Sequence, residues 1–124
     1  MIHVDTSFLI RSLVRGSPQD LLLRSWLHAG TVIEISAIAW TEFLCGPLQT
    51  SHLRLAQEVV RGPVPYLPED SGLAARLYND GGRRRGSLLD CMIAATAMRL
   101  GAALATTNLE DFRRLEPFGL RIAG

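Results

Sequence analysis

Short apolar runs alternate with longer stretches in which apolar positions recur at helical spacing along this chain of 124 residues. Three runs fit buried strands of a parallel sheet, namely residues 1–4 (MIHV), 31–36 (TVIEIS) and 102–107 (AALATT). An extended piece is expected at 63–68 and a terminal strand near 119–122. Helices are predicted over residues 6–16, 17–30, 37–46, 49–62, 69–82, 88–101 and 109–115.

Serines mark the start of three of these helices. Ser17 precedes a helix that has Pro18 at its first position, while Ser36 and Ser87 are N-caps of the helices at 37–46 and 88–101. Because helices separate the strands, the pattern predicts an α/β fold with a mostly parallel sheet, in one domain spanning residues 1–124. Ligands of such sheets bind beyond the carboxyl ends of the strands, so polar residues that follow strands are the first candidates for a site.

Apolar content also limits where the protein works. The longest apolar runs are too short to cross a bilayer, and the N-terminus lacks the pattern of a secretory signal, so we expect a soluble cytoplasmic protein. Cys45 and Cys91 each fall within an apolar helix without metal-like spacing, which predicts small buried residues. His3, His28 and His52 are scattered over different elements and are interpreted as structural or solvent-facing.

All thirteen basic residues are arginine, although the net charge is only +1. Codon choice in a GC-rich genome explains this at least as well as function does. The run GGRRRG at residues 81–86 is more informative, because Arg83, Arg84 and Arg85 stand together between glycines, just before the helix at 88–101. It is either a solvated loop or a contact for a polyanion.

Three acids occupy positions that ordinary surface acids do not. Asp5 follows the first strand, where it could also be a simple N-cap. Glu42 lies on the apolar helix at 37–46, which requires a buried arginine partner, a proton or a metal. Asp90 opens the apolar helix at 88–101, where it could also form a capping box with Ser87.

A fourth acid follows the last strong strand. Asp111 comes just before Phe112, which can anchor the short helix at 109–115, and Glu110 is its competitor for a role in the same site. Taken alone, Asp111 would be an ordinary surface acid.

The sheet topology could bring these four acids to one edge. Two carboxylates about 4 Å apart repel by roughly 4 kcal/mol at an effective dielectric constant of about 20, so such a cluster needs compensation. A hard divalent cation, Mg²⁺ or Mn²⁺, supplies it, whereas no cluster of histidine and cysteine indicates zinc. The chain also lacks a phosphate-binding GxxxxGK[ST] loop and a GxSxG nucleophile motif.

Four motifs together resemble the PIN-domain ribonucleases, and more narrowly the VapC-type toxins of type II toxin-antitoxin pairs. They are VDTS, WTEF, DCMIAATA and the segment GAALATTNLEDF, and the resemblance covers nearly the whole chain. It implies a three-layer α/β/α sandwich and metal-dependent endonuclease cleavage of RNA, with tRNA or rRNA as the class of target. It further implies a homodimer and a VapB-like antitoxin as partner.

The resemblance also implies roles for individual residues. The expected catalytic and metal-binding acids are Asp5, Glu42, Asp90 and Asp111. Thr6 and Asn108 match polar positions near the site, and some family members carry an acid where this chain has Asn108, which leaves the number of metals open. The expected RNA contacts are Arg83, Arg84 and Arg85.

A second interpretation belongs to another class of protein. A PIN-fold module without catalytic activity would act mainly inside a DNA-binding antitoxin complex. The helices that follow Ser17 and Ser36 have more apolar residues than one face needs, which fits a bound partner in either interpretation. A receiver-like phosphotransfer domain is disfavoured because the chain has no lysine to place near the acids.

Overall fold

A computed structural model describes all residues from Met1 to Gly124 and contains a sheet of four parallel strands. The strands are β1 (Ile2–Val4), β2 (Ile33–Ser36), β3 (Arg61–Val64) and β4 (Ala103–Ala105). Their order across the sheet is β3-β2-β1-β4, so β1 is central and is flanked by strands from distant parts of the chain. The predicted parallel sheet is therefore confirmed.

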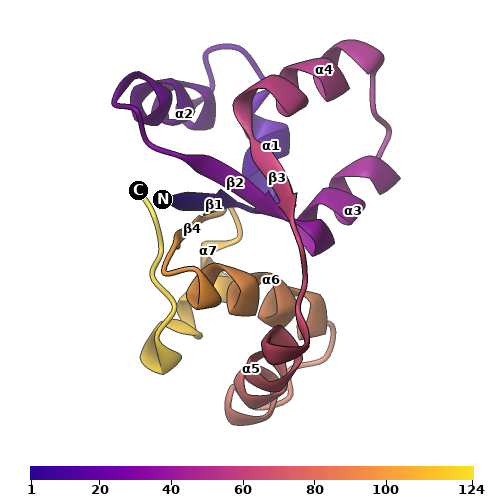
Figure 1. The fold of residues 1–124 in the computed structure, drawn as a ribbon, viewed down its shortest axis with the longest axis vertical. Coiled ribbons are helices and arrows are strands. Elements are labelled where there is room, and N and C mark those ends of the chain that lie inside the picture. The colour runs from indigo at the N-terminus through magenta and orange to yellow at the C-terminus, as the bar shows by residue number, and fades with distance from the viewer.

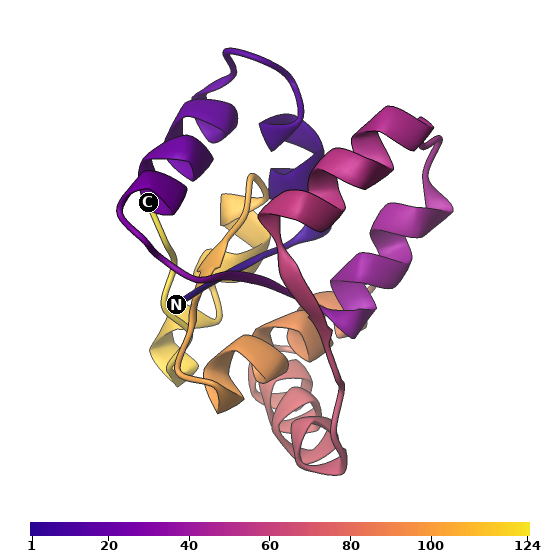
Figure 2. The ribbon, with the colours of Figure 1, turned by 45° about the horizontal axis from the view of Figure 1, so that its top comes forward.

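Helices connect the strands and cover both faces of the sheet. They are α1 (Thr6–Ser12), α2 (Pro18–His28), α3 (Ala37–Cys45), α4 (Thr50–Val59), α5 (Pro68–Asp80), α6 (Leu88–Arg99) and α7 (Leu109–Arg113). Figure 1 shows α1, α2 and α4 on one side of the sheet and α5 and α6 on the other. The view in Figure 2 keeps the same three layers, which confirms the predicted α/β/α architecture. None of these helices is long and apolar enough to cross a membrane.

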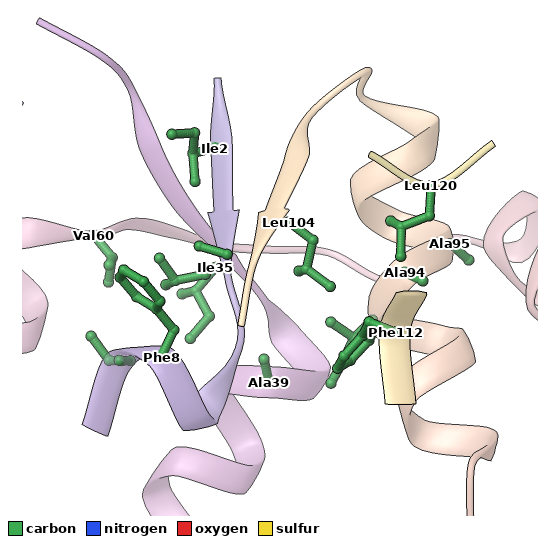
Figure 3. Close-up of a cluster of buried hydrophobic side chains, with 14 of the residues drawn as sticks. Ile2, Phe8, Ile35, Ala39, Val60, Ala94, Ala95, Leu104, Phe112 and Leu120 are labelled. Carbon is green, nitrogen blue, oxygen red and sulfur yellow. The ribbon is translucent and has the colours of Figure 1, made fainter. Parts of the chain in front are cut away.

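The hydrophobic core lies in two layers, one on each side of the strands. Figure 3 shows Phe8, Ile35 and Val60 gathered on one side, and Leu104 and Phe112 on the other. All five are buried. The small side chains of α6 let that helix approach the sheet closely, since Ala94, Ala95 and Ala97 are all fully buried. The core thus fixes both the sheet and the helix that begins near the acids.

Strand register determines which residues meet at the carboxyl edge of the sheet. Val4 of β1 pairs with Ala105 of β4, so the residues that follow them, Asp5 and Thr106, are neighbours. The main-chain N–H of Asp5 also donates to the carbonyl of Ala105, at 3.0 Å. On the other side of β1, β2 ends at Ser36 and α3 begins at once. The starts of α1 and α3 therefore lie at the same edge.

Two predictions about the strands are corrected. The helix expected at 49–62 ends at Val59, and β3 occupies residues 61–64 in place of the extended piece expected at 63–68. Pro63 is tolerated there because β3 is the edge strand and β2 is its only neighbour. The terminal strand expected near 119–122 is reduced to one bridge between Leu104 and Ile122.

Two of the three serine caps are confirmed. Ser17 accepts from the N–H of Asp20 at 3.0 Å, and Ser36 accepts from the N–H of Ala39 at 3.1 Å. Ser87 is wrong as a side-chain cap, because its hydroxyl donates to the carbonyl of Arg84 instead, at 2.6 Å.

The two cysteines differ in burial. Cys91 is fully buried as expected, but Cys45 is exposed, so the prediction that both are buried is wrong for Cys45. Cys45 is the last residue of α3, where the helix turns away from the core towards Gly46. The two thiols are free.

A buried ion pair that no sequence pattern indicated joins α5 to α6. Asp70, in the first turn of α5, is 1% exposed, and it accepts from Nε of Arg99 at 2.7 Å. The second carboxylate oxygen of Asp70 accepts from the main-chain N–H of Leu67 and from the hydroxyl of Thr96. This network fixes the end of α6 opposite to Asp90.

Candidate functional site

Asp5 is buried at the carboxyl end of β1 and is held by several donors. Its Oδ1 accepts from the N–H of Phe8 at 2.9 Å and from the Ser7 hydroxyl at 2.7 Å, and its Oδ2 accepts from the Thr106 hydroxyl at 2.6 Å. Burial nevertheless raises the pKa of Asp5 above its ordinary value, because these hydrogen bonds compensate only partly for desolvation. Asp5 is thus an N-cap, as one interpretation had it, and also a costly buried charge.

Two hydroxyl residues that the sequence analysis did not single out complete this corner. Thr106 donates to Asp5 and accepts from the main-chain N–H of Asn108 at 2.9 Å, while Ser7 accepts from the N–H of Thr107 at 3.0 Å. They fix the rotamer of Asp5 and join β1 to the segment after β4. A signal was available in the sequence, because both hydroxyls lie within three residues of a strand end.

Glu42 lies on α3, and no arginine contacts it. Its Oε1 is 3.3 Å from the hydroxyl of Thr6, which also donates to the carbonyl of Ala39 at 2.8 Å. Because a hydroxyl has one proton, the nearer carbonyl is its main acceptor and Glu42 is left with weak compensation. Burial, and then the charge of Asp5, raise the pKa of Glu42. The buried arginine pair considered for Glu42 is therefore wrong, and Thr6 lies where it was expected.

Asp90 is the most strongly perturbed of the four acids. It lies in the first turn of α6, half-buried, and accepts no hydrogen bond, so the capping box with Ser87 is wrong. Burial raises the pKa of Asp90 to about 6, with further contributions from the charges of Asp111, Glu42 and Asp5. All four acids therefore lie close enough together for Asp90 to respond to the other three.

Asp111 is half-buried near the start of α7 and is paired. Its Oδ1 is 3.3 Å from a guanidinium nitrogen of Arg84, yet it is still the largest charge acting on Asp90. Glu110 is exposed and is not among the charges that act most strongly on the pKa of Asp90, whereas Asp111 is the first of them. The side chain of Asn108 makes no hydrogen bond, whereas its main-chain N–H donates to Thr106 and its carbonyl accepts from the N–H of Asp111 at 3.1 Å.

The arginine run lies in the turn between α5 and α6. Arg83, Arg84 and Arg85 are all exposed, but only Arg84 forms an ion pair. A fourth arginine, outside this run, also acts on the acids. Arg114 lowers the pKa of Asp90 through its charge, and its guanidinium donates to the carbonyls of Asp111 and Gly81, at 3.0 and 2.9 Å.

The donor set matches a hard divalent cation in chemistry and charge. Carboxylates are the ligands that Mg²⁺ and Mn²⁺ prefer, and Asp90 and Glu42 have no basic side chain paired with them. Taken strictly by distance, however, no three aspartate, glutamate, histidine or cysteine side chains enclose a metal position. The acids are neighbours, but the carboxylate oxygens of Asp5 and Asp111 are turned towards hydrogen-bonding and ion-pair partners. This is why the acids lie close together without enclosing a metal position.

Comparison with known proteins places this arrangement in a family. The family model described as "PIN domain" matches residues 2–116. The chain belongs to the PIN-domain family. The match to this PIN domain spans all four strands and all four acids, so the family assigned from the motifs is confirmed.

Two further comparisons agree. Ribonuclease VapC1 of Rickettsia felis is 33% identical over 124 residues, which cover 91% of this chain and 89% of that protein. Among solved structures, VapBC2 from Rickettsia felis bound to a DNA fragment from its promoter aligns with a TM-score of 0.78 at 18% identity, over 99% of this chain and 98% of that one. FitAcB from Neisseria gonorrhoeae aligns with a TM-score of 0.72 at 18% identity, over 100% and 97%. At 18% identity, the similarity to these two solved structures shows a shared fold alone.

Proposed function

We propose that this PIN domain is a metal-dependent endoribonuclease and the toxin of a VapBC-type toxin-antitoxin pair. Two facts support the proposal from outside the site: the family itself, and the 33% identity to a protein named as a ribonuclease. Within the site, the observation that carries it is the gathering of Asp5, Glu42 and Asp111 around Asp90, close enough for their charges to add to the effect of burial on the pKa of Asp90. A fold keeps such uncompensated charge where function requires it.

Asp5, Glu42, Asp90 and Asp111 are the residues that would hold Mg²⁺ or Mn²⁺. A divalent cation bound there would lower the pKa of a water ligand and neutralise charge on the phosphodiester. The hydroxyls of Ser7 and Thr106 keep Asp5 in one rotamer, so this carboxylate is oriented before any ligand arrives. Thr6 places α1 against α3 and so sets the position of Glu42.

Glu42 is the candidate to orient the attacking water or to complete the coordination. No basic side chain is paired with it, and its contact with the Thr6 hydroxyl is long, at 3.3 Å, so its carboxylate is available to a water or a cation. In-line attack by water, with the 3′-oxygen as the leaving group, leaves a 5′-phosphate and a 3′-hydroxyl. It does not need the neighbouring 2′-hydroxyl. The proposal that the substrate is RNA and not DNA therefore rests on the relative named as a ribonuclease, because the acids alone do not distinguish the two.

The test is cleavage of structured RNAs, tRNA and rRNA included, by the purified protein with Mn²⁺ or Mg²⁺. We expect Asp5→Asn to lower the rate at least about 100-fold, since the acid that the site orients most firmly is lost. Asparagine also caps helices well, so α1 is retained. Glu58→Gln, an exposed substitution on α4, is the control and should cleave as the wild type does.

Equal cleavage by the wild type and Asp5→Asn would contradict the proposal. Cleavage by neither, without growth arrest when the chain is expressed alone, would favour the binding module that acts within a DNA-binding complex. A single-stranded DNA of the same sequence, run in parallel, measures the preference for RNA.

An antitoxin is the proposed partner, and α1, α3 and the segment after α3 offer a surface for it. A groove of about 290 Å³ is lined by apolar side chains that include Ile10, Val14 and Phe43, and Ile10 and Val14 are half exposed, at 49% and 53%. The expected excess of apolar residues is also visible on α2 and α3, where Leu21 and Leu44 are exposed. Co-purification with the product of a neighbouring small gene tests this partner, and light scattering tests the proposed homodimer.

A further inference from the structure

The arginine loop, residues 81–86, is hydrogen-bonded through its first residue, Gly81, to the arginine that follows α7. Arg114, which directly follows α7, donates through Nη1 to the carbonyl of Gly81 at 2.9 Å and through Nε to the carbonyl of Asp111 at 3.0 Å. Both acceptors are main-chain carbonyls, so these contacts hold the loop without forming an ion pair. The loop is thereby kept beside the helix that carries Asp111.

A second contact joins the same two elements through side chains. The guanidinium of Arg84 lies 3.3 Å from Oδ1 of Asp111, while Arg83 and Arg85 form no ion pair. The two partners are 51% and 40% exposed, so the pair is solvated and holds weakly. One arginine of three is therefore attached to an acid of the site, by a contact that is easily broken.

Two kinds of ligand compete with this pair. A phosphodiester offers a guanidinium two oxygens in a forked, charge-assisted contact, which is stronger than the single contact of 3.3 Å between Arg84 and Asp111. A cation among the acids would attract Asp111, which is the largest charge acting on Asp90. A phosphodiester bound to Arg84 would leave Asp111 free for the cation, and a cation bound to Asp111 would leave Arg84 free for the phosphodiester.

We propose that Arg84 is an exchangeable latch: in the free protein it holds Asp111, and a phosphate of bound RNA takes it and so releases Asp111 to the acid site. Arg84 thus acts as a positioning residue as well as a phosphate contact. The inference rests on the proposed function and adds a coupling to it. RNA and divalent cation each favour the other's binding, by the reciprocity that governs any two linked ligands.

The first test needs no metal. Binding of a labelled single-stranded RNA is measured by fluorescence anisotropy in EDTA, for the wild type, Asp111→Asn, Arg84→Gln and the double variant. We expect Asp111→Asn to tighten binding about 3-fold, because Arg84 is set free. In the Arg84→Gln background the same substitution should have only the smaller effect of removing a nearby charge, which Glu110→Gln measures on its own.

Equal gains in the two backgrounds, or a gain from Glu110→Gln as large as that from Asp111→Asn, would overturn the latch. The second test is Mn²⁺ affinity, read from the electron paramagnetic resonance of the free ion. Arg84→Gln should bind Mn²⁺ about 2- to 5-fold more tightly than the wild type. Arg83→Gln removes the same charge from the same loop and should change the affinity less.

The outcomes separate the latch from the nuclease. RNA cleavage that requires Mn²⁺, with no difference between Arg84→Gln and Arg83→Gln in the titration, would contradict the latch and keep the proposed function. Coupling between Arg84 and Asp111 in EDTA, without Mn²⁺ binding or cleavage, would support the exchange of Arg84 between Asp111 and RNA, but it would contradict both the coupling to a cation and the proposed metal-dependent activity.

Discussion

The two ends of α6 hold acids in opposite states. At its C-terminal end, Arg99 pairs with Asp70, and although burial opposes the effect, the hydrogen bonds from Arg99 and from the main chain of Leu67 keep the pKa of Asp70 below its ordinary value. At its N-terminal end, Asp90 accepts no hydrogen bond, and burial and like charges raise its pKa to about 6. The two ends of α6 thus take part in a compensated acid network, through Arg99, and in an uncompensated one, through Asp90.

The difference separates an acid that stabilises the fold from one that destabilises it. Asp70 has donors on both carboxylate oxygens, so its ionised form is favoured in the native state. Asp90 ionises less readily in the native state than in the unfolded chain, so its charge at neutral pH costs stability unless a cation binds there. Substitutions at the two ends should therefore change stability with opposite signs and with opposite dependence on pH.

The largest effect is expected for Asp70→Asn. Loss of the charge leaves Arg99 without its partner, and unfolding should become easier by about 3 kcal/mol at neutral pH. Because the pKa of Asp70 is lowered, its contribution is present above the ordinary value of 3.8 and is lost as the pH falls through the native value, so the difference from wild type should shrink in acid. Denaturant unfolding across pH measures it. The exposed neighbour variant Glu69→Gln should stay close to wild type.

A smaller effect of the opposite sign is expected for Asp90→Asn. The raised pKa of about 6 means that ionisation costs stability as the pH rises from the ordinary value of 3.8 to about 6, and the full cost persists above that. Without metal at neutral pH the variant should be more stable by about 2 kcal/mol once solvent screening is included, and equal to wild type in strong acid.

Thermal melts with and without EDTA measure the Asp90→Asn effect. Glu110→Gln, which removes an exposed acid that is not among the main charges acting on Asp90, is the matched control. A stabilisation that is the same at every pH would mean that repulsion among the acids is not its cause. Added Mn²⁺ should raise the melting temperature of the wild type more than that of Asp90→Asn.

The smallest effect is expected for Glu42→Gln. Burial and the charge of Asp5 raise the pKa of Glu42, so its ionised form is also disfavoured, and the variant should gain up to about 1 kcal/mol in metal-free buffer as the pH rises above the ordinary range of a glutamate. The same melts measure it, with Glu58→Gln as control. A less stable Glu42→Gln variant would show that the carboxylate has a favourable partner after all.

The sequence predicted the elements that depend on local periodicity and caps. Buried apolar runs located β1, β2 and β4, and Ser17 and Ser36 located the starts of two helices. It failed at β3, because a strand of RGPV has almost no apolar pattern and pairs only through the edge of β2. Such a strand is defined by its neighbour, which a local pattern does not contain.

For the site, the sequence supplied the acids but not their surroundings. Strand ends and an acid on an apolar helix indicated Asp5 and Glu42, and the structure places both at the carboxyl edge of the sheet. The partners come from distant segments: Thr106 is 101 positions from Asp5, and Arg99 is 29 from Asp70. Which acid is compensated depends on these long-range contacts, so Asp70 passed as an ordinary first-turn acid.

The unequal burial of the two cysteines allows a spectroscopic probe to be attached at one position. Cys91 is sealed in the core, and burial raises the pKa of its thiol, so a maleimide dye should react at Cys45 alone. That label would sit on the same helix as Glu42, three positions further along. Its fluorescence would then report events at the carboxyl edge of the sheet without any engineered residue.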